Sequence, residues 1–176
     1  VGRRGCPCNG WRQGAQGHVP RCINQPVVGA TRDGGYAEVM LARATGLVSI
    51  PDELKAEEAA PILCAGSATF NALKKSGAEA GDLVAILGIG GLGHMALQYA
   101  RRMGFKVAAL GRGSDIAAAA WALAAHVYID PNEEDAAARL RRMGGAQAIV
   151  TTISPVGTVP PLVTCIAPQG PPALVS

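Results

Sequence analysis

Apolar residues follow two different periods along the chain from about residue 81 onwards. Short uninterrupted apolar runs, such as Leu-Val-Ala-Ile-Leu at 83–87, are typical of parallel strands that are buried on both faces. The segments between these runs repeat apolar residues every three or four positions, which is the period of an amphipathic helix. Strands that alternate with helices predict an α/β fold with a parallel sheet.

The predicted elements of this α/β region follow one another closely. Strands are expected at 83–87, 106–110, 126–129 and 146–152, with a weaker candidate at 173–175. The first helix follows residue 90 and is closed by Gly104. Its apolar face is expected to hold Leu92, Met95, Ala96, Tyr99, Ala100 and Met103, and its polar face His94, Gln98, Arg101 and Arg102. Ser114 or Asp115 is expected to cap a helix that reaches residue 125, and Asn132 to cap a helix over 133–143.

The first third of the chain has weaker signals. Residues 1–30 show neither period and are predicted to form a loop. Strands are expected at 36–42 and 47–50, followed by a helix over 52–60 that Pro61 interrupts. A second helix is expected over about 64–75.

Three glycines directly after the first strand of the α/β region have the spacing G-x-G-x-x-G. Gly88 permits a tight turn, Gly90 lets the backbone approach a pyrophosphate, and Gly93 lets the helix pack closely on the strand. The start of the helix offers unpaired N–H groups to a phosphate. We therefore expect dinucleotide binding at Gly88, Ile89, Gly90, Gly91, Leu92 and Gly93.

Composition and charge exclude several classes of protein. The net charge of +3 is too small to indicate nucleic-acid binding, and no run of 18 or more apolar residues could form a membrane span. No apolar region typical of a secretory signal is visible at the N-terminus. Five cysteines are an odd number, which does not suit a disulfide framework, so a cytoplasmic location is expected.

Three of the cysteines, Cys6, Cys8 and Cys22, lie in the first loop. Structural zinc requires four ligands, and His18 is the only nearby candidate for the fourth. The spacing of the three cysteines is poor for a metal site, and it favours free thiols.

Four phrases together resemble the zinc-dependent alcohol dehydrogenases of the medium-chain dehydrogenase/reductase superfamily. The phrases are DGGYAEVM at 33–40, PDELKAEEAAPILCAG at 51–66, AILGIGGLGHMALQYAR at 85–101 and AHVYID at 125–130. The resemblance implies part of a GroES-like catalytic domain at 1–60 and an incomplete Rossmann domain at 61–176. Since family members are about twice this length, we expect an internal part of such an enzyme that lacks both ends.

The resemblance also implies the origin of the metal-binding residues. Cys64 in PILCAG matches a ligand of the catalytic zinc, whose other two ligands are expected before Val1. Cys8 and Cys22 match two positions of the four-cysteine structural-zinc loop, whose other two positions are occupied by Trp11 and Gly14. Zinc is therefore expected in the intact family and not in this chain. Family members usually have Thr at the position of Ala68, near the nicotinamide, and here Thr69 follows it.

The function implied is hydride transfer between NAD(P) and a small alcohol or aldehyde, in a family that is often homo-oligomeric. Two alternatives are a nucleotide-binding protein without catalysis and a zinc-free, quinone-reductase-like member of the superfamily. Cofactor choice is predicted from the end of the second strand, where NAD-specific proteins have an acid that binds the ribose 2′-OH. Here Arg112 and Ser114 stand near that position, which favours NADP over NAD.

Overall fold

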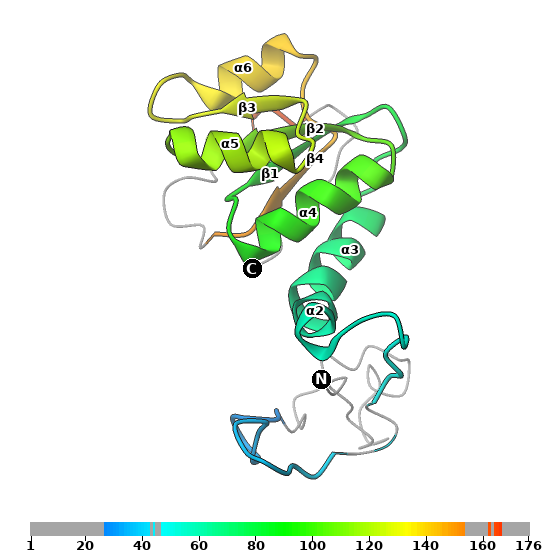
Figure 1. Ribbon diagram of the computed structural model, residues 1–176. Coiled ribbons are helices and arrows are strands. Elements are labelled where there is room, and N and C mark those ends of the chain that lie inside the picture. Colours follow the sequence, from blue (N-terminus) through cyan, green and yellow to red (C-terminus); the bar gives the residue numbers. More distant parts are fainter. Residues whose placement is uncertain (1–26, 43, 45–46, 154–161, 163, 167–176) are drawn as a thin grey trace. The chain divides into compact units, whose positions relative to one another are not determined.

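The computed structural model describes residues 27–42, 44, 47–153, 162 and 164–166 (Figure 1). The chain divides into two compact units, Val1–Ala60 and Pro61–Ser176. The second unit contains the sheet and its helices. The assignment of the first unit to a GroES-like catalytic domain stays a prediction.

A parallel sheet of four strands forms the centre of the second unit. The strands are β1 (Leu83–Leu87), β2 (Lys106–Leu110), β3 (Val127–Ile129) and β4 (Ala148–Thr151). Their order is β3-β2-β1-β4, and every neighbouring pair is parallel. The chain thus runs outward from β1 to β3 and then returns to the other side of β1. In open sheets of this kind, ligands bind beyond the carboxyl ends of the strands where the order reverses, which here lies between β1 and β4.

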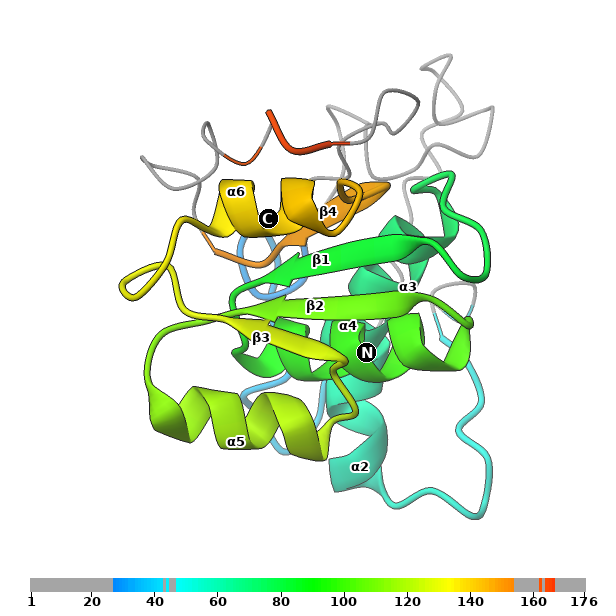
Figure 2. The ribbon, with the colours of Figure 1, turned by 90° about the horizontal axis from the view of Figure 1, so that it is seen from above.

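Helices cover both faces of the sheet, which confirms the predicted Rossmann-like α/β fold (Figure 2). Alternate residues of β1 enter different cores: Val84 and Ile86 pack against α3, α4 and α5, whereas Ala85 packs on the side of α6. The helices are α3 (Ser67–Lys74), α4 (Gly91–Arg102), α5 (Ser114–Ala122) and α6 (Ala136–Arg142). All five residues of β1 are buried, as expected for a strand covered on both faces.

Helix α4 connects β1 to β2 and ends as predicted. Gly104 has φ +86°, and the N–H of Phe105 donates to the carbonyl of Ala100 at 3.1 Å, which closes the last turn. The predicted apolar face was rotated from the true one. The buried residues of α4 are Gly93, Ala96, Leu97 and Ala100. Of the predicted face, Ala96 and Ala100 are in the core, and Tyr99 and Met103 pack against it. The prediction missed Leu97, which is fully buried, whereas Leu92 and Met95 are only partly buried.

The helix before the sheet is not interrupted at Pro61, contrary to the prediction. Pro61 is the last residue of α2 (Ala56–Pro61), and a π-helical turn, η3 (Ile62–Gly66), leads directly into α3. The N–H of Ser67 reaches back to the carbonyl of Ile62, five residues earlier. Proline lacks an N–H and crowds the preceding turn, and a widened turn directly after it lets the helix continue.

The predicted caps of α5 and α6 were wrong. The N-cap of α5 is Gly113, without a side-chain hydrogen bond, so neither Ser114 nor Asp115 caps it. The N-cap of α6 is Asp135, whose carboxylate accepts from the N–H of Ala138 at 3.0 Å. The segment before α6 instead forms a turn at Asp130, which accepts from the N–H of Asn132. That turn delays the start of α6 to Ala136.

The strands predicted at 36–42 and 47–50 are absent from the described residues of the first unit. Tyr36, Val39 and Leu41 are almost fully exposed. A strand requires a neighbour for its backbone groups, and within the described part of this unit the only pairing is one bridge between Val28 and Arg32. The strand candidate at 173–175 lies outside the described residues. Within the described part of the chain, no helix is long and apolar enough to cross a membrane.

Candidate functional site

The turn between β1 and α4 depends on two crowded glycines. Gly88 has φ +91°, and a Cβ atom there would lie 2.5 Å from Cγ2 of Ile153. A Cβ atom on Gly93 would overlap the carbonyl oxygen of Gly88. The first glycine therefore makes the turn, and Gly93 lets the helix begin directly against the end of β1. Both are roles that the G-x-G-x-x-G spacing predicts.

Gly90 and Gly91 face open space, because an added Cβ would meet no atom within 4 Å at either position. The first backbone bond of α4 runs from the N–H of His94 to the carbonyl of Gly90, at 2.8 Å. The N–H groups of Gly91, Leu92 and Gly93 therefore have no partner among the described residues. Such an N-terminus attracts an anion, since its N–H groups and the helix dipole both present positive charge.

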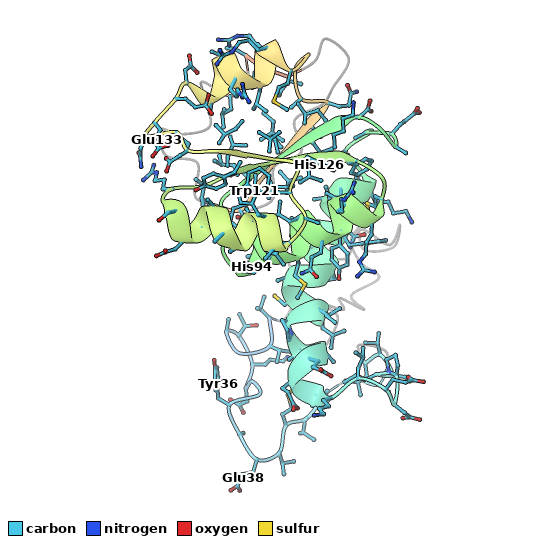
Figure 3. All side chains as sticks on the ribbon, turned by 45° about the horizontal axis from the view of Figure 1, so that its top comes forward. Tyr36, Glu38, His94, Trp121, His126 and Glu133 are labelled. Carbon is cyan, nitrogen blue, oxygen red and sulfur yellow. The ribbon has the colours of Figure 1, made fainter. Side chains whose placement is uncertain are left out.

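The neighbours of these N–H groups have mainly supporting contacts. Ile89 is buried in the core, so only its backbone faces the turn. Nδ1 of the His94 ring lies 2.8 Å from the Gly90 carbonyl oxygen, which fixes the orientation of that carbonyl. Figure 3 shows His94 at the start of α4. The turn thus combines a braced carbonyl with three N–H groups that no described residue pairs.

Thr152, just past the end of β4, braces the same turn and was not predicted from the sequence. Its hydroxyl donates to the carbonyl of Gly88 at 2.8 Å, and its N–H donates to the carbonyl of Leu87 at 2.9 Å. A threonine 64 residues from its partner has no local signal, because only the parallel pairing of β4 with β1 brings the two together.

The loop after β2 is the second part of the site. Gly111 is tightly packed, because a Cβ there would lie 2.6 Å from Ile116 and 3.3 Å from the Tyr128 ring. Gly113 has φ +91°. Between them, Arg112 is exposed, and so is Ser114 at the start of α5. Arg112 makes no side-chain hydrogen bond or ion pair with any residue that the structure describes.

Two side chains of the β3 region hold this loop, and sequence reasoning missed both. The hydroxyl of Tyr128 donates to the Gly113 carbonyl at 3.0 Å, and Oδ2 of Asp130 accepts from the Gly113 N–H at 2.7 Å. Asp130 is only 8% exposed. The N–H groups of Gly113 and Asn132, with the nearby charge of Arg112, hold the pKa of Asp130 below its ordinary value. The signal in the sequence was the phrase AHVYID, in which Asp130 directly follows the strand.

Cys64 is an exposed free thiol within η3. The residues that the structure describes contain no group of three or more His, Cys, Asp or Glu side chains that could hold a metal ion. Catalytic zinc needs three protein ligands, so the described residues around Cys64 do not fit zinc. Cys8 and Cys22 lie outside the described residues, and their assignment to a degenerate zinc loop stays a prediction.

Thr69 cannot replace the family threonine whose position is occupied by Ala68. Its side chain is fully buried, and its hydroxyl donates to the carbonyls of Ala65 and Gly66, at 2.7 and 3.2 Å. A hydroxyl that is bound to its own helix is not available to a ligand.

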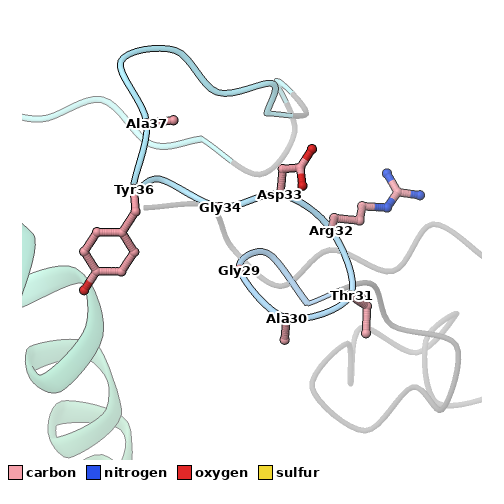
Figure 4. Close-up of a pocket in the computed structure, with 8 residues that line it drawn as sticks. All are labelled: Gly29, Ala30, Thr31, Arg32, Asp33, Gly34, Tyr36 and Ala37. Atoms are coloured by element: carbon pink, nitrogen blue, oxygen red, sulfur yellow. The ribbon is translucent and has the colours of Figure 1, made fainter.

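A hollow of about 680 Å³ lies in the first unit, and no predicted site residue is among the residues that line it. Its lining residues belong to one surface turn (Figure 4): Gly29, Ala30, Thr31, Arg32, Asp33, Gly34, Tyr36 and Ala37. All but Gly34 are classed as exposed. Ligand sites are usually concave and mostly apolar, so this open turn is a poor candidate.

Comparisons with known proteins agree with this geometry. Residues 91–176 match the family model described as zinc-binding dehydrogenase. The alcohol dehydrogenase patD of Aspergillus clavatus is 47% identical over 148 residues, which cover 84% of this chain and 38% of that protein. An alcohol dehydrogenase of Geobacillus stearothermophilus is 44% identical over 151 residues, which cover 81% of this chain and 45% of that protein. The chain thus spans less than half the length of these curated relatives.

Solved structures give the same result. A protein assigned as a zinc-binding dehydrogenase of Sinorhizobium meliloti 1021, in complex with NADP, has a TM-score of 0.89 at 25% identity, with 99% of this chain and 52% of that chain covered. The alcohol dehydrogenase of Aeropyrum pernix has a TM-score of 0.83 at 26% identity, with 96% of this chain and 51% of that chain covered.

Proposed function

The chain belongs to the alcohol dehydrogenase family of zinc-binding, medium-chain dehydrogenases, and from that premise we propose that it serves hydride transfer between NADP(H) and a small alcohol or aldehyde. The observation that carries the proposal is the set of N–H groups at Gly91, Leu92 and Gly93, beyond the carboxyl end of β1, which have no partner in the described part of the chain. Ligands of open parallel sheets generally bind beyond this edge, which supports the proposal. The relatives are alcohol dehydrogenases, which supports the substrate class.

The glycine turn would hold the pyrophosphate of the nucleotide. The N–H groups of Gly91, Leu92 and Gly93 would donate to its oxygens, and the open space at Gly90 and Gly91 leaves room for close approach. When bound, the nicotinamide supplies the hydride donor or acceptor. Residues of this chain would orient the nucleotide, since Thr152 and His94 contact the carbonyls of Gly88 and Gly90 and so hold the turn that presents the N–H groups.

NADP is favoured over NAD because the loop after β2 presents a guanidinium where an acid would bind the ribose 2′-OH. Arg112 is exposed and has no ion-pair partner among the described residues, so its planar donors are available to a 2′-phosphate. The hydroxyl of Ser114 would add one hydrogen bond. The expected preference is roughly 1–3 kcal/mol, as for hydrogen bonds to a charged group. The NADP complex of the Sinorhizobium relative supports this choice.

Catalysis by zinc is not assigned to the described residues, since they contain no group of three or more side chains that could hold the metal with Cys64. That observation favours a second function, nucleotide binding without turnover. A small-molecule substrate and a homo-oligomeric assembly remain expectations from the family, and a cytoplasmic location remains an expectation from the cysteine count. Nucleic acid and membranes are not expected partners.

Binding of nucleotide fragments tests the proposal without requiring turnover. Adenosine 2′,5′-bisphosphate and AMP share the adenosine and the 5′-phosphate, and they differ only in the 2′-phosphate. We expect both nucleotides to bind, and the bisphosphate to bind more tightly. Arg112→Ala should remove this difference in affinity. Arg102→Ala, a control at the end of α4, should leave the difference unchanged. Equal affinity for the two nucleotides in the unaltered chain would contradict the NADP assignment.

A reductase assay beside metal analysis then separates three possible functions. Turnover of an alcohol or aldehyde in a zinc-containing preparation would support the dehydrogenase. Nucleotide binding without turnover would support the binding protein, and turnover in a preparation free of zinc would support the zinc-free alternative.

A further inference from the structure

We propose that Tyr128 and Asp130 select the cofactor without touching it, by positioning the loop that presents Arg112 to the 2′-phosphate. This inference rests on the proposed function, because it concerns the same nucleotide site. It assigns a role in specificity to the end of β3, whereas the residues that contact the nucleotide belong to the loops after β1 and β2.

The two side chains hold both peptide planes around Gly113. The Gly113 N–H lies in the plane that includes the Arg112 carbonyl, and it donates to Asp130 at 2.7 Å. The Gly113 carbonyl lies in the next plane, and it accepts from Tyr128 at 3.0 Å. With both planes held, φ and ψ of Gly113 are fixed at 91° and 160°. The backbone on the C-terminal side of Arg112 is therefore held in place.

Gly113 cannot hold this conformation without help. A glycine loses more conformational freedom on ordering than any other residue, and an added Cβ at Gly113 would meet no atom within 4 Å. A side chain at Gly113 would therefore not be packed, and the restraint comes from hydrogen bonds to its peptide groups. Tyr128 and Asp130 supply two of these bonds, and the N–H of Ala117 in α5 donates a third to the Gly113 carbonyl at 3.1 Å. At Gly111 the situation is reversed, because Ile116 and the Tyr128 ring surround it closely. Tyr128 thus contacts the loop on both sides of Arg112.

Both side chains have the protonation state that these bonds need. The N–H groups of Gly113 and Asn132, and secondarily the charge of Arg112, lower the pKa of Asp130, which is therefore ionised and accepts at neutral pH. Burial, and then the negative charges of Asp130 and Glu133, raise the pKa of Tyr128, whose hydroxyl therefore remains a donor. Figure 3 shows Glu133 beyond the end of β3, on the same side as the loop.

A purely electrostatic role for Asp130 and a positioning role predict opposite effects of Asp130→Asn on binding of the 2′-phosphate. Asp130 is close enough to Arg112 for the charge of Arg112 to lower its pKa. If the carboxylate acted only through its charge, Asp130→Asn would strengthen binding of the doubly charged 2′-phosphate. If it acts by holding Gly113, the same substitution weakens that binding, because Arg112 is presented less often in the binding conformation. Tyr128→Phe carries no change of charge and isolates the positioning effect.

The test compares affinities for adenosine 2′,5′-bisphosphate and AMP in the 176-residue chain and its variants. Tyr128→Phe is expected to reduce the preference for the bisphosphate by about 2- to 10-fold, the loss of one hydrogen bond, and Asp130→Asn at least as much. The affinity for AMP, whose phosphate binds the glycine turn, should be nearly unchanged. That separation is a readout that a general loss of stability would not produce.

Matched controls are present in the same unit. Asp135→Asn removes a carboxylate that likewise accepts from a backbone N–H, at the start of α6. Tyr99→Phe removes a hydroxyl from α4 that lies away from the loop. Both controls should leave the preference between the two nucleotides unchanged.

Each outcome decides the inference. Reduced preference in both loop variants, with unchanged controls, supports it. It is overturned if Arg112→Ala abolishes the preference while Tyr128→Phe and Asp130→Asn leave it intact, or if Asp130→Asn increases it. In those cases the proposed function still stands. If the unaltered chain shows no preference, the NADP assignment fails first and the inference fails with it. Should Asp130→Asn not fold, Tyr128→Phe alone decides.

Discussion

The two loops that would bind the nucleotide are held in place by different means. The turn after β1 takes its shape from its own glycines, at Gly88 and Gly93, with side chains bracing it from outside. The loop after β2 takes its shape from Tyr128 and Asp130, which follow Gly113 by 15 and 17 residues. A turn of the first kind is visible in the spacing of a few residues. A loop of the second kind depends on which strand lies beside it.

Gly93→Ala is expected to have the largest effect, because it attacks the first loop at its backbone. The new Cβ would overlap the carbonyl oxygen of Gly88, and backbone atoms at the end of a buried strand cannot move aside easily. We expect a loss of at least about 3 kcal/mol in the free energy of unfolding, as for other severe steric changes. Urea unfolding followed by circular dichroism measures it.

Gly91→Ala is the matched control for that variant, since an added Cβ at Gly91 meets no atom within 4 Å. It should not destabilise the fold, and alanine is a better helix former than glycine by up to about 1 kcal/mol. If the two alanine variants unfold at the same urea concentration, the close approach of α4 to β1 is not what Gly93 permits.

Gly113→Ala tests the second loop in the same way and should cost less. No atom obstructs the new Cβ, but φ of +91° is unfavourable for alanine, with a cost of about 1–3 kcal/mol. The loop can relieve this strain by leaving its conformation, and then Arg112 is presented incorrectly. We therefore expect a lower affinity for adenosine 2′,5′-bisphosphate with a nearly unchanged affinity for AMP. Equal losses for both nucleotides in calorimetric titrations would show that the two loops are not independent.

The same contrast explains what could be predicted from the sequence. Gly88, Gly90 and Gly93 lie within six residues of one another and directly after an apolar run, so local chemistry determines the turn. The order of strands and helices was also predictable, since each apolar run is continuous. Asp130 and Thr152 could not be assigned roles, because their partners are close only after the parallel sheet forms. Arg112 was identified by its place after β2, but the residues that hold it were not.

Errors in the predicted elements have the same origin. Pro61 was expected to interrupt the helix because its missing N–H is a local feature, whereas the widened turn of η3 that follows it was not visible in the pattern. The strands expected at 36–42 and 47–50 have suitable composition, but strands need partners, and the described residues of the first unit provide none for them.

Thr152→Val should have a smaller effect on the glycine turn. It removes the hydroxyl that donates to Gly88 at 2.8 Å and keeps a side chain of similar size. The expected loss of stability is about 0.5–1.5 kcal/mol, the net value of one hydrogen bond, with a modest decrease in affinity for both nucleotides. Thermal unfolding of the variant and the unaltered chain measures the loss. A decrease confined to the bisphosphate would contradict the assignment of Thr152 to the first loop.

Acid pH should loosen the second loop and leave the first unaffected. The pKa of Asp130 is lower in the folded protein than its ordinary value of 3.8, so the unfolded chain binds its proton more readily. The stabilisation of the fold by the ionised Asp130 carboxylate is therefore complete above about pH 3.8, and it is lost as the pH falls through the folded-state pKa of Asp130. The amide resonance of Gly113 should titrate over this range, while those of Gly91, Leu92 and Gly93 stay in place. The titration should disappear in Asp130→Asn, and its persistence there would assign it to another group.

The most direct test of the central claim is an amide NMR titration of the chain with adenosine 2′,5′-bisphosphate and with AMP. Both nucleotides should shift the resonances of Gly91, Leu92 and Gly93, because both carry a 5′-phosphate for the glycine turn. Only the bisphosphate should also shift those of Arg112, Gly113 and Ser114. The division of the site into a phosphate turn and a 2′-phosphate loop would be contradicted by either of two results. In the first, AMP shifts the resonances of the second loop as much as the bisphosphate does. In the second, neither nucleotide shifts the resonances of the glycine turn.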